Sequence, residues 1–453
     1  MNHRISFLLF ILFGFHAKLC GSSPITIQGY KMFDAAGNYF PVRGMDYFPR
    51  PNSGTLNENN YDWFTDDHID VWRDHIAEFK ALNVNSIRLY AVDPTKSHDK
   101  FMCALEAAGI YAIVDLAASC ENCAITKDIA PTCYPKELKS RGELIIAAFA
   151  KYQNVLGFSA GNEVNLVVSD WTINASCQKK FIRDMRNYIQ SCSSSMRSIP
   201  VGLAVADTDR IANAQYYNCR TNASDTLENA EWFGLNAYLF CDGTYNDRKT
   251  PHPGFSGLLK DIQSAEPSIP MLLTEYGCLD ASFPSAGEHA AQRTWIQTAW
   301  LHSSLFREYF NGGFVFEFST EKANSQSTSN FPFTSFGPQN YGTGYFSPSE
   351  CDHDKIKCTF VRQPNFYNLS NEFGQVSIAQ EPSKNAFTPS TSRSKPPSCP
   401  PKSPSLSSVS WNGVEQVKSL ACPSNAKSFQ CTATSLTKET AQAGQSPNKK
   451  SNC

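Results

Sequence analysis

The sequence predicts an α/β protein built on a closed (β/α)8 barrel, the TIM barrel, and three observations lead to this fold class. The chain has 453 residues, enough for one large domain of about 250 residues or more and an appendage. Hydrophobic residues make up 41% of it and aromatic residues 12%, which fits a globular protein with a sizeable core. Apolar runs of strand length alternate with segments of helical periodicity, the pattern of βα units around a parallel sheet.

Residues 1–20 are typical of a secretory signal peptide. A short basic start precedes the apolar run Ile5–Phe15, and the chain becomes small and polar near Cys20. This run is too short to cross a bilayer, and no later apolar stretch is long enough to do so. The polar C-terminus lacks the hydrophobic tail of a lipid-anchor signal. We therefore expect a soluble protein without a transmembrane segment, secreted to the extracellular space or the cell wall.

Eight apolar runs supply the strands that the barrel needs. They are Tyr39–Met45, Val84–Val92, Ile110–Leu116, Val155–Ala160, Ile199–Val205, Trp232–Tyr238, Ile269–Thr274 and Gly313–Phe318. Helical periodicity separates them, for example over 71–82, 100–108, 180–189 and 289–310. We assign residues 21–350 to the barrel domain, and an open doubly wound sheet is the alternative.

The composition changes after the barrel. We expect residues 351–398 to be an extension and a flexible linker, because Pro, Ser and Lys accumulate over 381–408 without apolar periodicity. Residues 399–453 hold cysteines around a lone Trp411 and are too short and polar to build a core unaided. We interpret them as a disulfide-tied fragment or a disordered tail, and their composition slightly favours disorder.

Cysteine usage and charge exclude some classes of function. Sixteen cysteines fit an oxidising compartment, and their spacings do not match a zinc site, so we predict no metal. Cys120 and Cys123, with Cys133 nearby, favour a disulfide-braced loop insertion over a metal or redox site. A net charge of only -2 argues against nucleic acid as a partner.

Three tripeptides along the chain permit N-glycosylation. They begin at Asn174, Asn222 and Asn368.

Two acidic residues close predicted strands, at the barrel face where such folds place catalytic groups. Glu163 follows the fourth run in Phe158–Glu163, and Glu275 follows the seventh in Leu272–Cys278. A carboxylate at the end of a buried strand is costly to desolvate unless it has partners or a task.

Two carboxylates in one pocket are what retaining cleavage of a glycosidic bond requires. One of them, with a raised pKa, protonates the departing oxygen, and the other attacks the anomeric carbon. We predict Glu163 as the general acid/base and Glu275 as the nucleophile, with Asn162 at the sugar 2-hydroxyl. The alternative is a pair of carboxylates in surface loops or salt bridges. This chemistry needs no cofactor, and we expect none.

Several motifs, in order along the chain, resemble those of a known family. They are Ile87–Pro94, Phe149–Tyr152, Gly157–Phe158, Ala160–Val164, Arg197–Gly202 and Glu275–Cys278. They resemble the fungal-type β-1,3-glucanosyltransferases, glycoside hydrolase family 72, over roughly Pro24 to Cys351. The resemblance implies an enzyme that cuts an internal β-1,3-glucan linkage and passes the new reducing end to another glucan chain.

The resemblance also implies roles for further residues. Tyr90, Asp115 and Tyr238 would line the donor groove, Arg88 would lie near the nucleophile, and Glu317 would accept hydrogen bonds in the groove. Each has a structural alternative. Arg88 and Glu317 could be ion-pair partners, the two tyrosines could be core aromatics, and Asp115 could be a helix cap.

The chain departs from the family pattern at several positions. Trp72 and Phe101 replace a usual cysteine pair, so an aromatic contact would take the place of that disulfide. Asp46 and Phe48 replace the usual Ala and Gln. The tail has only a faint resemblance to the start of a glucan-binding module, and we interpret it as a remnant. By resemblance alone, the disulfide pairs would be Cys241 with Cys278 and Cys219 with Cys351.

Three functions stay open at this point. The first is a β-1,3-glucanosyltransferase, which we expect to act as a monomer on glucan donor and acceptor chains. The second is a secreted endo-β-glycosidase of the same clan, which would let water instead of a sugar hydroxyl resolve the intermediate. The third is a non-catalytic glucan-binding wall protein. The two intact glutamates weigh against the third.

Overall fold

The computed structural model describes residues 23–240, 245, 247–277, 294–325, 331–332, 342–424 and 426–431. Eight parallel strands close into a barrel in the order β10-β3-β4-β5-β6-β7-β8-β9. Their bounds are β3 Val42–Asp46, β4 Ser86–Leu89, β5 Tyr111–Asp115, β6 Val155–Asn162, β7 Val201–Ala206, β8 Phe233–Asn236, β9 Met271–Tyr276 and β10 Phe310–Val315. Each of the eight predicted runs overlaps one of these strands. The predicted TIM barrel is therefore confirmed, and the alternative of an open sheet is wrong.

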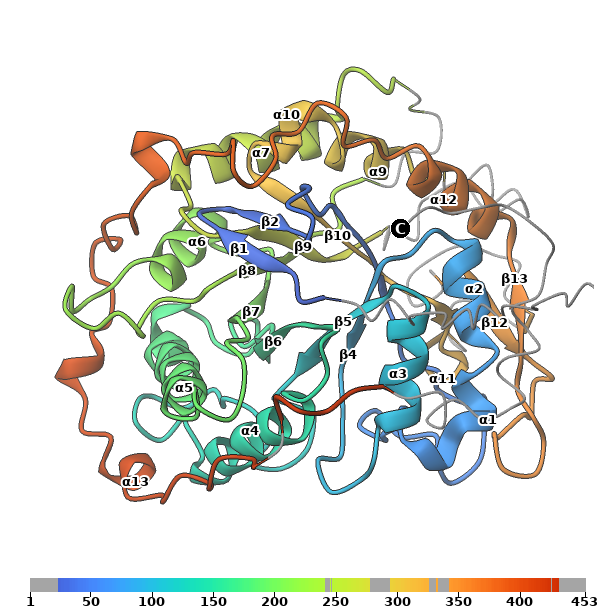
Figure 1. Ribbon diagram of the computed structural model, residues 1–453, viewed down its shortest axis with the longest axis horizontal. Coiled ribbons are helices and arrows are strands. Elements are labelled where there is room, and N and C mark those ends of the chain that lie inside the picture. The colour runs from blue at the N-terminus through green and yellow to red at the C-terminus, as the bar shows by residue number, and fades with distance from the viewer. Residues whose placement is uncertain are drawn as a thin grey trace, which may run out of the picture.

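Helices surround the strands, as Figure 1 shows. In chain order they are α1 Ile69–Trp72, α2 His75–Ala81, α3 Asp99–Ala107, α4 Lys136–Phe149, α5 Thr172–Ser191, α6 Arg210–Asn218, α7 Pro253–Ala265, α9 Ile296–Leu301 and α10 Ser304–Arg307. A short 3-10 helix, η1, spans Asp66–His68. The local sequence explains where two of these helices begin. Helix α7 has Pro253 in its first turn, and α10 is capped by the Ser303 side chain, which accepts a hydrogen bond from the Phe306 N–H.

The barrel strands are buried on both faces, which explains why each of them is a continuous apolar run in the sequence. Close packing also fixes glycine at some positions. A Cβ on Gly202 would lie 2.3 Å from the ring of Trp232, so only glycine lets this ring fill the barrel interior. The predicted aromatic contact is confirmed, since the rings of Trp72 and Phe101 lie 5.2 Å apart.

A small hairpin closes the barrel at the amino ends of its strands. It consists of β1 (Thr26–Gln28) and β2 (Lys31–Phe33). Met32 packs in one cluster with Val42 and Trp232. A second small sheet, at the opposite end, contains β11 (Ser319–Thr320), β12 (Gly344–Ser347) and β13 (Thr359–Arg362), with helices α11 (Lys322–Ser325) and α12 (Pro364–Gly374).

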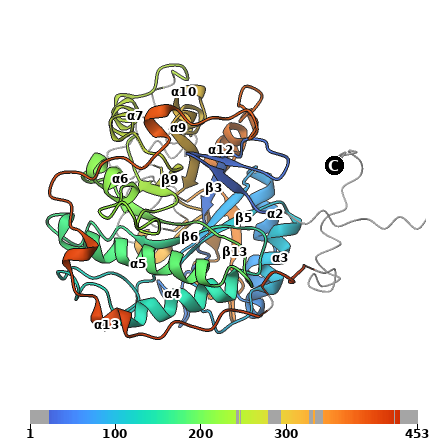
Figure 2. The same cartoon turned by 60° about the vertical axis from the view of Figure 1, so that its left-hand side comes forward.

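The end of the chain packs along the outside of the barrel. We call residues 381–431 the C-terminal belt; it contains η2 Thr391–Arg393, η3 Leu406–Ser408 and α13 Asn412–Glu415. Figures 1 and 2 show it passing α7, α6, α5 and α4 and ending beside α3. Three disulfides tie it to the barrel: Cys219–Cys399, Cys192–Cys422 and Cys103–Cys431.

The belt corrects two predictions. Residues 381–398 are not a flexible linker, because Phe387 and Arg393 are buried and the Arg393 guanidinium stacks 3.5 Å from the ring centroid of Tyr30. Residues 399–424 and 426–431 are not disordered, because the barrel surface supplies the core that the tail cannot build alone. Trp411, for example, is 5% exposed and donates its indole N–H to the carbonyl of Leu406.

The predicted disulfide between Cys219 and Cys351 is wrong. Each of these cysteines bonds another one: Cys219 bonds Cys399, and Cys351 bonds Cys358, with Cα atoms 5.2 Å and 5.0 Å apart. The other predicted pair, Cys241 with Cys278, lies outside the described residues.

The loop after β5 is braced by disulfides, as predicted. Cys120 bonds Cys123, and Cys133 bonds Cys177 of α5. Within the described ranges, no helix is long and apolar enough to span a membrane.

Candidate active site

A cavity of about 670 Å3 opens at the carboxyl ends of the barrel strands. Strand ends and the loops that follow them supply its walls. It is lined by Asp46, Phe48, Asn59, Tyr90, Asp115, Ala117, Ala118, Ser119, Ala124, Ile125, Asn162, Glu163, Val164, Val167, Phe316, Glu317, Glu321 and Asn324. We call this cavity the groove. Among the described residues, no group of three or more His, Cys, Asp or Glu is placed to hold a metal ion.

Glu275 lies in β9 and both of its carboxylate oxygens accept hydrogen bonds. Oε1 accepts from the Tyr90 hydroxyl at 2.9 Å and from Nη1 of Arg88 at 3.2 Å. Oε2 accepts from the Tyr238 hydroxyl at 2.6 Å. Three donors on one buried carboxylate fix its orientation.

Arg88, in β4, connects Glu275 to the rest of the site. Its guanidinium donates to both oxygens of Asp115, through Nη2 at 2.9 Å and Nε at 3.3 Å. Nη2 also donates to Oδ1 of Asn162 at 2.9 Å. The same group stacks 4.4 Å from the ring centroid of Tyr90. Arg88 is fully buried, so these contacts compensate the cost of removing its charge from water.

Glu163 comes directly after β6 and has a different environment. Its φ of 51° lies in the left-handed region, which strains a residue other than glycine. Burial raises the pKa of the Glu163 carboxyl, and the negative charge of Glu275 raises it further. A hydrogen bond of 3.0 Å from Nδ2 of Asn236 to Oε1 only partly opposes this shift. Glu163 is therefore the glutamate of the pair whose protonated form is favoured by its surroundings.

Asn236 is a site residue that the sequence interpretation missed. It ends β8, and its Nδ2 donates both to Glu163 and, at 3.1 Å, to Oδ1 of Asn162. Thr274 holds the Asn236 amide by donating to its Oδ1 at 2.7 Å. The signal was present in the sequence, because a polar residue interrupts the apolar run 232–238 at the catalytic face.

A second group of acids also lines the groove. Asp46, at the end of β3, is 1% exposed, and neither of its carboxylate oxygens has a hydrogen-bond partner among the described residues. Burial raises the pKa of Asp46 well above its ordinary value, and the charge of Glu275 adds to this. Burial also raises the pKa of Glu317, together with the charge of Glu321. Glu321 itself pairs with Arg50 at 2.9 Å.

The structure brings all eight predicted catalytic and substrate-binding residues to one end of the barrel. It also distinguishes between a role in the site and a purely structural role for several of them. Tyr90 and Tyr238 are not simply core aromatics, because both hydroxyls donate to Glu275. Asp115 is not a helix cap, since its carboxylate binds the Arg88 guanidinium. Arg88 is an ion-pair partner of Asp115, as the alternative proposed, but it also pairs with Glu275 itself.

The three predicted glycosylation tripeptides lie in different surroundings. Asn174 is fully buried in α5, and its Nδ2 donates to the carbonyls of Thr126 and Val164. A glycan cannot be attached to a buried, hydrogen-bonded amide of the folded protein, so this prediction is wrong. Asn222 is exposed in the loop after α6, and Asn368 is half-buried in α12.

Comparison with known proteins relates the chain to one family. The family model described as Glucanosyltransferase matches residues 17–328. The chain is 33% identical over 332 residues to the 1,3-beta-glucanosyltransferase gas5 of Schizosaccharomyces pombe, a match that covers 71% of this chain and 60% of that protein. It is also 33% identical over 306 residues to the 1,3-beta-glucanosyltransferase gel1 of Aspergillus fumigatus, covering 67% and 60%. The chain thus spans about 60% of the length of these curated relatives.

A solved structure shares the fold. The structure of Saccharomyces cerevisiae Gas2p in complex with laminaripentaose superposes with a TM-score of 0.62 at 24% identity and covers 82% of this chain and 75% of that one.

Proposed function

This chain belongs to the glucanosyltransferase family, and on that premise we propose that it is a retaining β-1,3-glucanosyltransferase with Glu275 as nucleophile and Glu163 as general acid/base. One observation carries the assignment of roles. Three hydrogen bonds orient the side chain of Glu275, whereas burial and the charge of Glu275 favour the protonated form of Glu163. A charged nucleophile beside a neutral acid is the starting state that the first step needs.

In the first step, the donor glucan is cleaved. An oxygen of Glu275 attacks the anomeric carbon of the sugar unit in the groove and forms a covalent bond to it. Glu163 gives its proton to the glycosidic oxygen, which leaves with the rest of the chain as a hydroxyl. The strained backbone at Glu163 is one of the features that point its carboxyl into the groove.

In the second step, a hydroxyl of an acceptor glucan takes the place of the departed chain. It attacks the anomeric carbon and loses its proton to the Glu163 carboxylate, and the bond to Glu275 breaks. The product is a longer chain with the original anomeric configuration. Water in place of the acceptor would give hydrolysis by the same residues.

The surrounding residues position these groups. Arg88 connects Glu275, Asp115 and Asn162, so one guanidinium sets the geometry of the nucleophile and of the amide that we assign to the sugar 2-hydroxyl. Asn236 orients both Asn162 and Glu163. We assign Glu317 to the groove as an acceptor for sugar hydroxyls.

We propose β-1,3-glucan chains as both donor and acceptor, on the strength of the names of the curated relatives. We also propose that the protein acts outside the cell, in or at the wall. The disulfides found among the described residues support an oxidising compartment. A monomer suffices, since one chain supplies every residue of the site described above.

The test is to incubate the secreted protein with a reduced β-1,3-gluco-oligosaccharide and to resolve the products by mass. Products longer than the starting oligosaccharide would establish transfer. Shorter products alone would make the protein a hydrolase. An unchanged oligosaccharide, with other β-glucans also left intact, would contradict the catalytic proposal and leave a binding role.

A further inference from the structure

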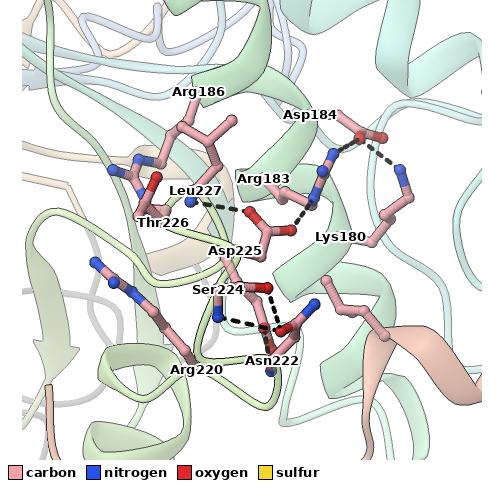
Figure 3. Close-up of polar contacts among 12 residues, drawn as sticks. Lys180, Arg183, Asp184, Arg186, Arg220, Asn222, Ser224, Asp225, Thr226 and Leu227 are labelled. Carbon is pink, nitrogen blue, oxygen red and sulfur yellow. Dashed lines mark hydrogen bonds and ion pairs between the residues drawn. The ribbon is translucent and has the colours of Figure 1, made fainter.

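Asn222 differs from Asn174 in how its side-chain amide is held. Its Oδ1 accepts hydrogen bonds from the backbone N–H of Ser224 at 3.1 Å and from the Ser224 hydroxyl at 2.8 Å, as Figure 3 shows. No hydrogen bond from Nδ2 is found among the described residues, and the residue is exposed. The third residue of the tripeptide thus engages the amide oxygen and leaves the nitrogen free to carry a glycan.

A depression of about 410 Å3 borders Asn222, between α5 and the C-terminal belt. Lys180 and Arg183 line it on the side of α5, and Val409 and Asn412 line it on the side of the belt. Its volume lies within the roughly 300–1,000 Å3 typical of small-molecule sites. The mixture of polar and apolar lining suits a sugar unit, which has hydroxyl edges and C–H faces.

The positive charges of Lys180 and Arg183 at this depression are already compensated. Lys180 pairs with Asp184 at 2.6 Å and with Glu415 at 3.5 Å. Arg183 pairs with Asp225 at 2.5 Å (Figure 3). An anionic ligand would have to compete with these carboxylates, whereas a neutral sugar would not.

Next to this depression, the belt has a long segment that no disulfide ties to the barrel. Its anchors at Cys399 and Cys422 leave 400–421 held by non-covalent contacts. Among these contacts, Lys139 donates to the carbonyl of Val417 at 2.9 Å, and Tyr216 donates to that of Pro404 at 2.8 Å. An additional contact in this interval would therefore affect how often the belt opens locally.

We propose that Asn222 carries an N-linked glycan whose first sugar units lie in this depression and contact both α5 and the belt. In the modification, Nδ2 of Asn222 bonds to the anomeric carbon of an oligosaccharide supplied on a lipid diphosphate. The lipid diphosphate leaves with the bonding electrons, and the amide loses one proton. The attached glycan stabilises the belt over 405–417.

The first measurement is peptide mapping by mass spectrometry of the chain secreted from a eukaryotic host. The wild type and Ser224→Thr keep the tripeptide and should carry a glycan on the peptide that contains Asn222. Asn222→Gln and Ser224→Ala should lack it. Because threonine retains the hydroxyl, Ser224→Thr is the matched control. An unmodified Asn222 in the secreted wild type would overturn the proposal.

The second measurement places the glycan by hydrogen exchange. Amides of 405–417 should exchange faster, by roughly threefold or more, in Asn222→Gln and Ser224→Ala than in the wild type and Ser224→Thr. Removing the glycan from the folded wild type with a glycan-releasing amidase should give the same increase, which controls for any effect of the substitutions on folding. Equal exchange with and without the glycan would show that the sugar points into solvent and would overturn its placement in the depression. Neither readout depends on catalytic activity.

Discussion

The Tyr238 hydroxyl donates a hydrogen bond of 2.6 Å to Oε2 of Glu275. Tyr238 follows β8 and Glu275 lies in β9, its parallel neighbour in the barrel. The hydroxyl and Arg88 bind different oxygens of the same carboxylate, so the carboxylate is held from two sides. Tyr90, which donates to the other oxygen of Glu275, lines the groove, so the carboxylate lies directly behind the groove wall.

The two glutamates should differ in how they respond to loss of the carboxylate. Glu275→Gln removes the nucleophile and should lower transfer by roughly 10⁴-fold or more while oligosaccharide binding is kept. Glu163→Gln removes the acid and should lower activity on a glucan donor by about 10²–10⁴-fold. Product analysis and binding by calorimetry would measure both effects.

A glycosyl fluoride donor separates these roles further. Fluoride leaves without a proton, so the first step with this donor should survive in Glu163→Gln and should stay blocked in Glu275→Gln. The reverse pattern would exchange the two assignments.

Removing the hydroxyl of Tyr238 tests how much its hydrogen bond to the nucleophile contributes to catalysis. Tyr238→Phe deletes one hydrogen bond to a charged acceptor, worth about 1.5–3 kcal/mol, so kcat should fall roughly 10- to 150-fold. The fold and KM should change little. Tyr245→Phe is a matched control, because the Tyr245 hydroxyl donates to the carbonyl of Thr250 away from the groove lining. An equal loss of kcat in the two variants would show that the Tyr238 hydroxyl does not support the nucleophile.

Asp46 should make the stability of the fold depend on pH. Burial first, and the charge of Glu275 second, raise the pKa of Asp46 in the folded protein. A group of this kind stabilises the fold below its unfolded pKa of about 3.9, and that contribution is lost as pH rises through the folded pKa. Because asparagine cannot ionise, Asp46→Asn should gain stability over the wild type as pH rises above about 4, by up to about 1.4 kcal/mol per pH unit.

Thermal unfolding of both proteins across this pH range would measure the difference. Asp70→Asn serves as the control, since the Asp70 side chain is 86% exposed and should show no such trend. A stability difference for Asp46→Asn that stayed constant with pH would mean that Asp46 is ionised in the folded protein.

The barrel and most of the site could be predicted because both follow from short-range patterns. Strands buried on both faces give apolar runs such as Ile110–Leu116, and their carboxyl ends meet at one face, so the order of the runs alone places Glu163 and Glu275 together. Asn236 was missed because a single polar residue in an apolar run has many explanations. Asp46 was noticed only as a departure from a family pattern, since burial and missing partners cannot be read from sequence.

A disulfide-tied tail was one of two interpretations of the sequence, but the course of the C-terminal belt around the barrel could not be predicted, for a physical reason. Its own composition is polar and rich in Pro and Ser, which favours disorder. Its order comes from contacts with helices that precede it by hundreds of residues, such as the bond between Cys103 and Cys431, 328 residues apart. Connectivity of this kind is not encoded in local spacing, and the predicted pairing of Cys219 with Cys351 failed for the same reason.

The disulfides of the belt should stabilise the fold more, the longer the chain segment that they close, although the gain grows only slowly with length. Replacing both cysteines of the Cys219–Cys399 pair by serine reopens a connection across 180 residues and should lower the free energy of unfolding by about 2–4 kcal/mol. The matched control is the same replacement at Cys120 and Cys123, which are only 3 residues apart and should contribute less. Urea unfolding of both double variants measures the difference.

Transfer activity should persist in the belt variant below its unfolding transition. The belt packs on the outer side of the helices, and none of its described residues lines the groove. If activity were lost while the barrel stayed folded, the belt would have a role in the site that its position does not suggest.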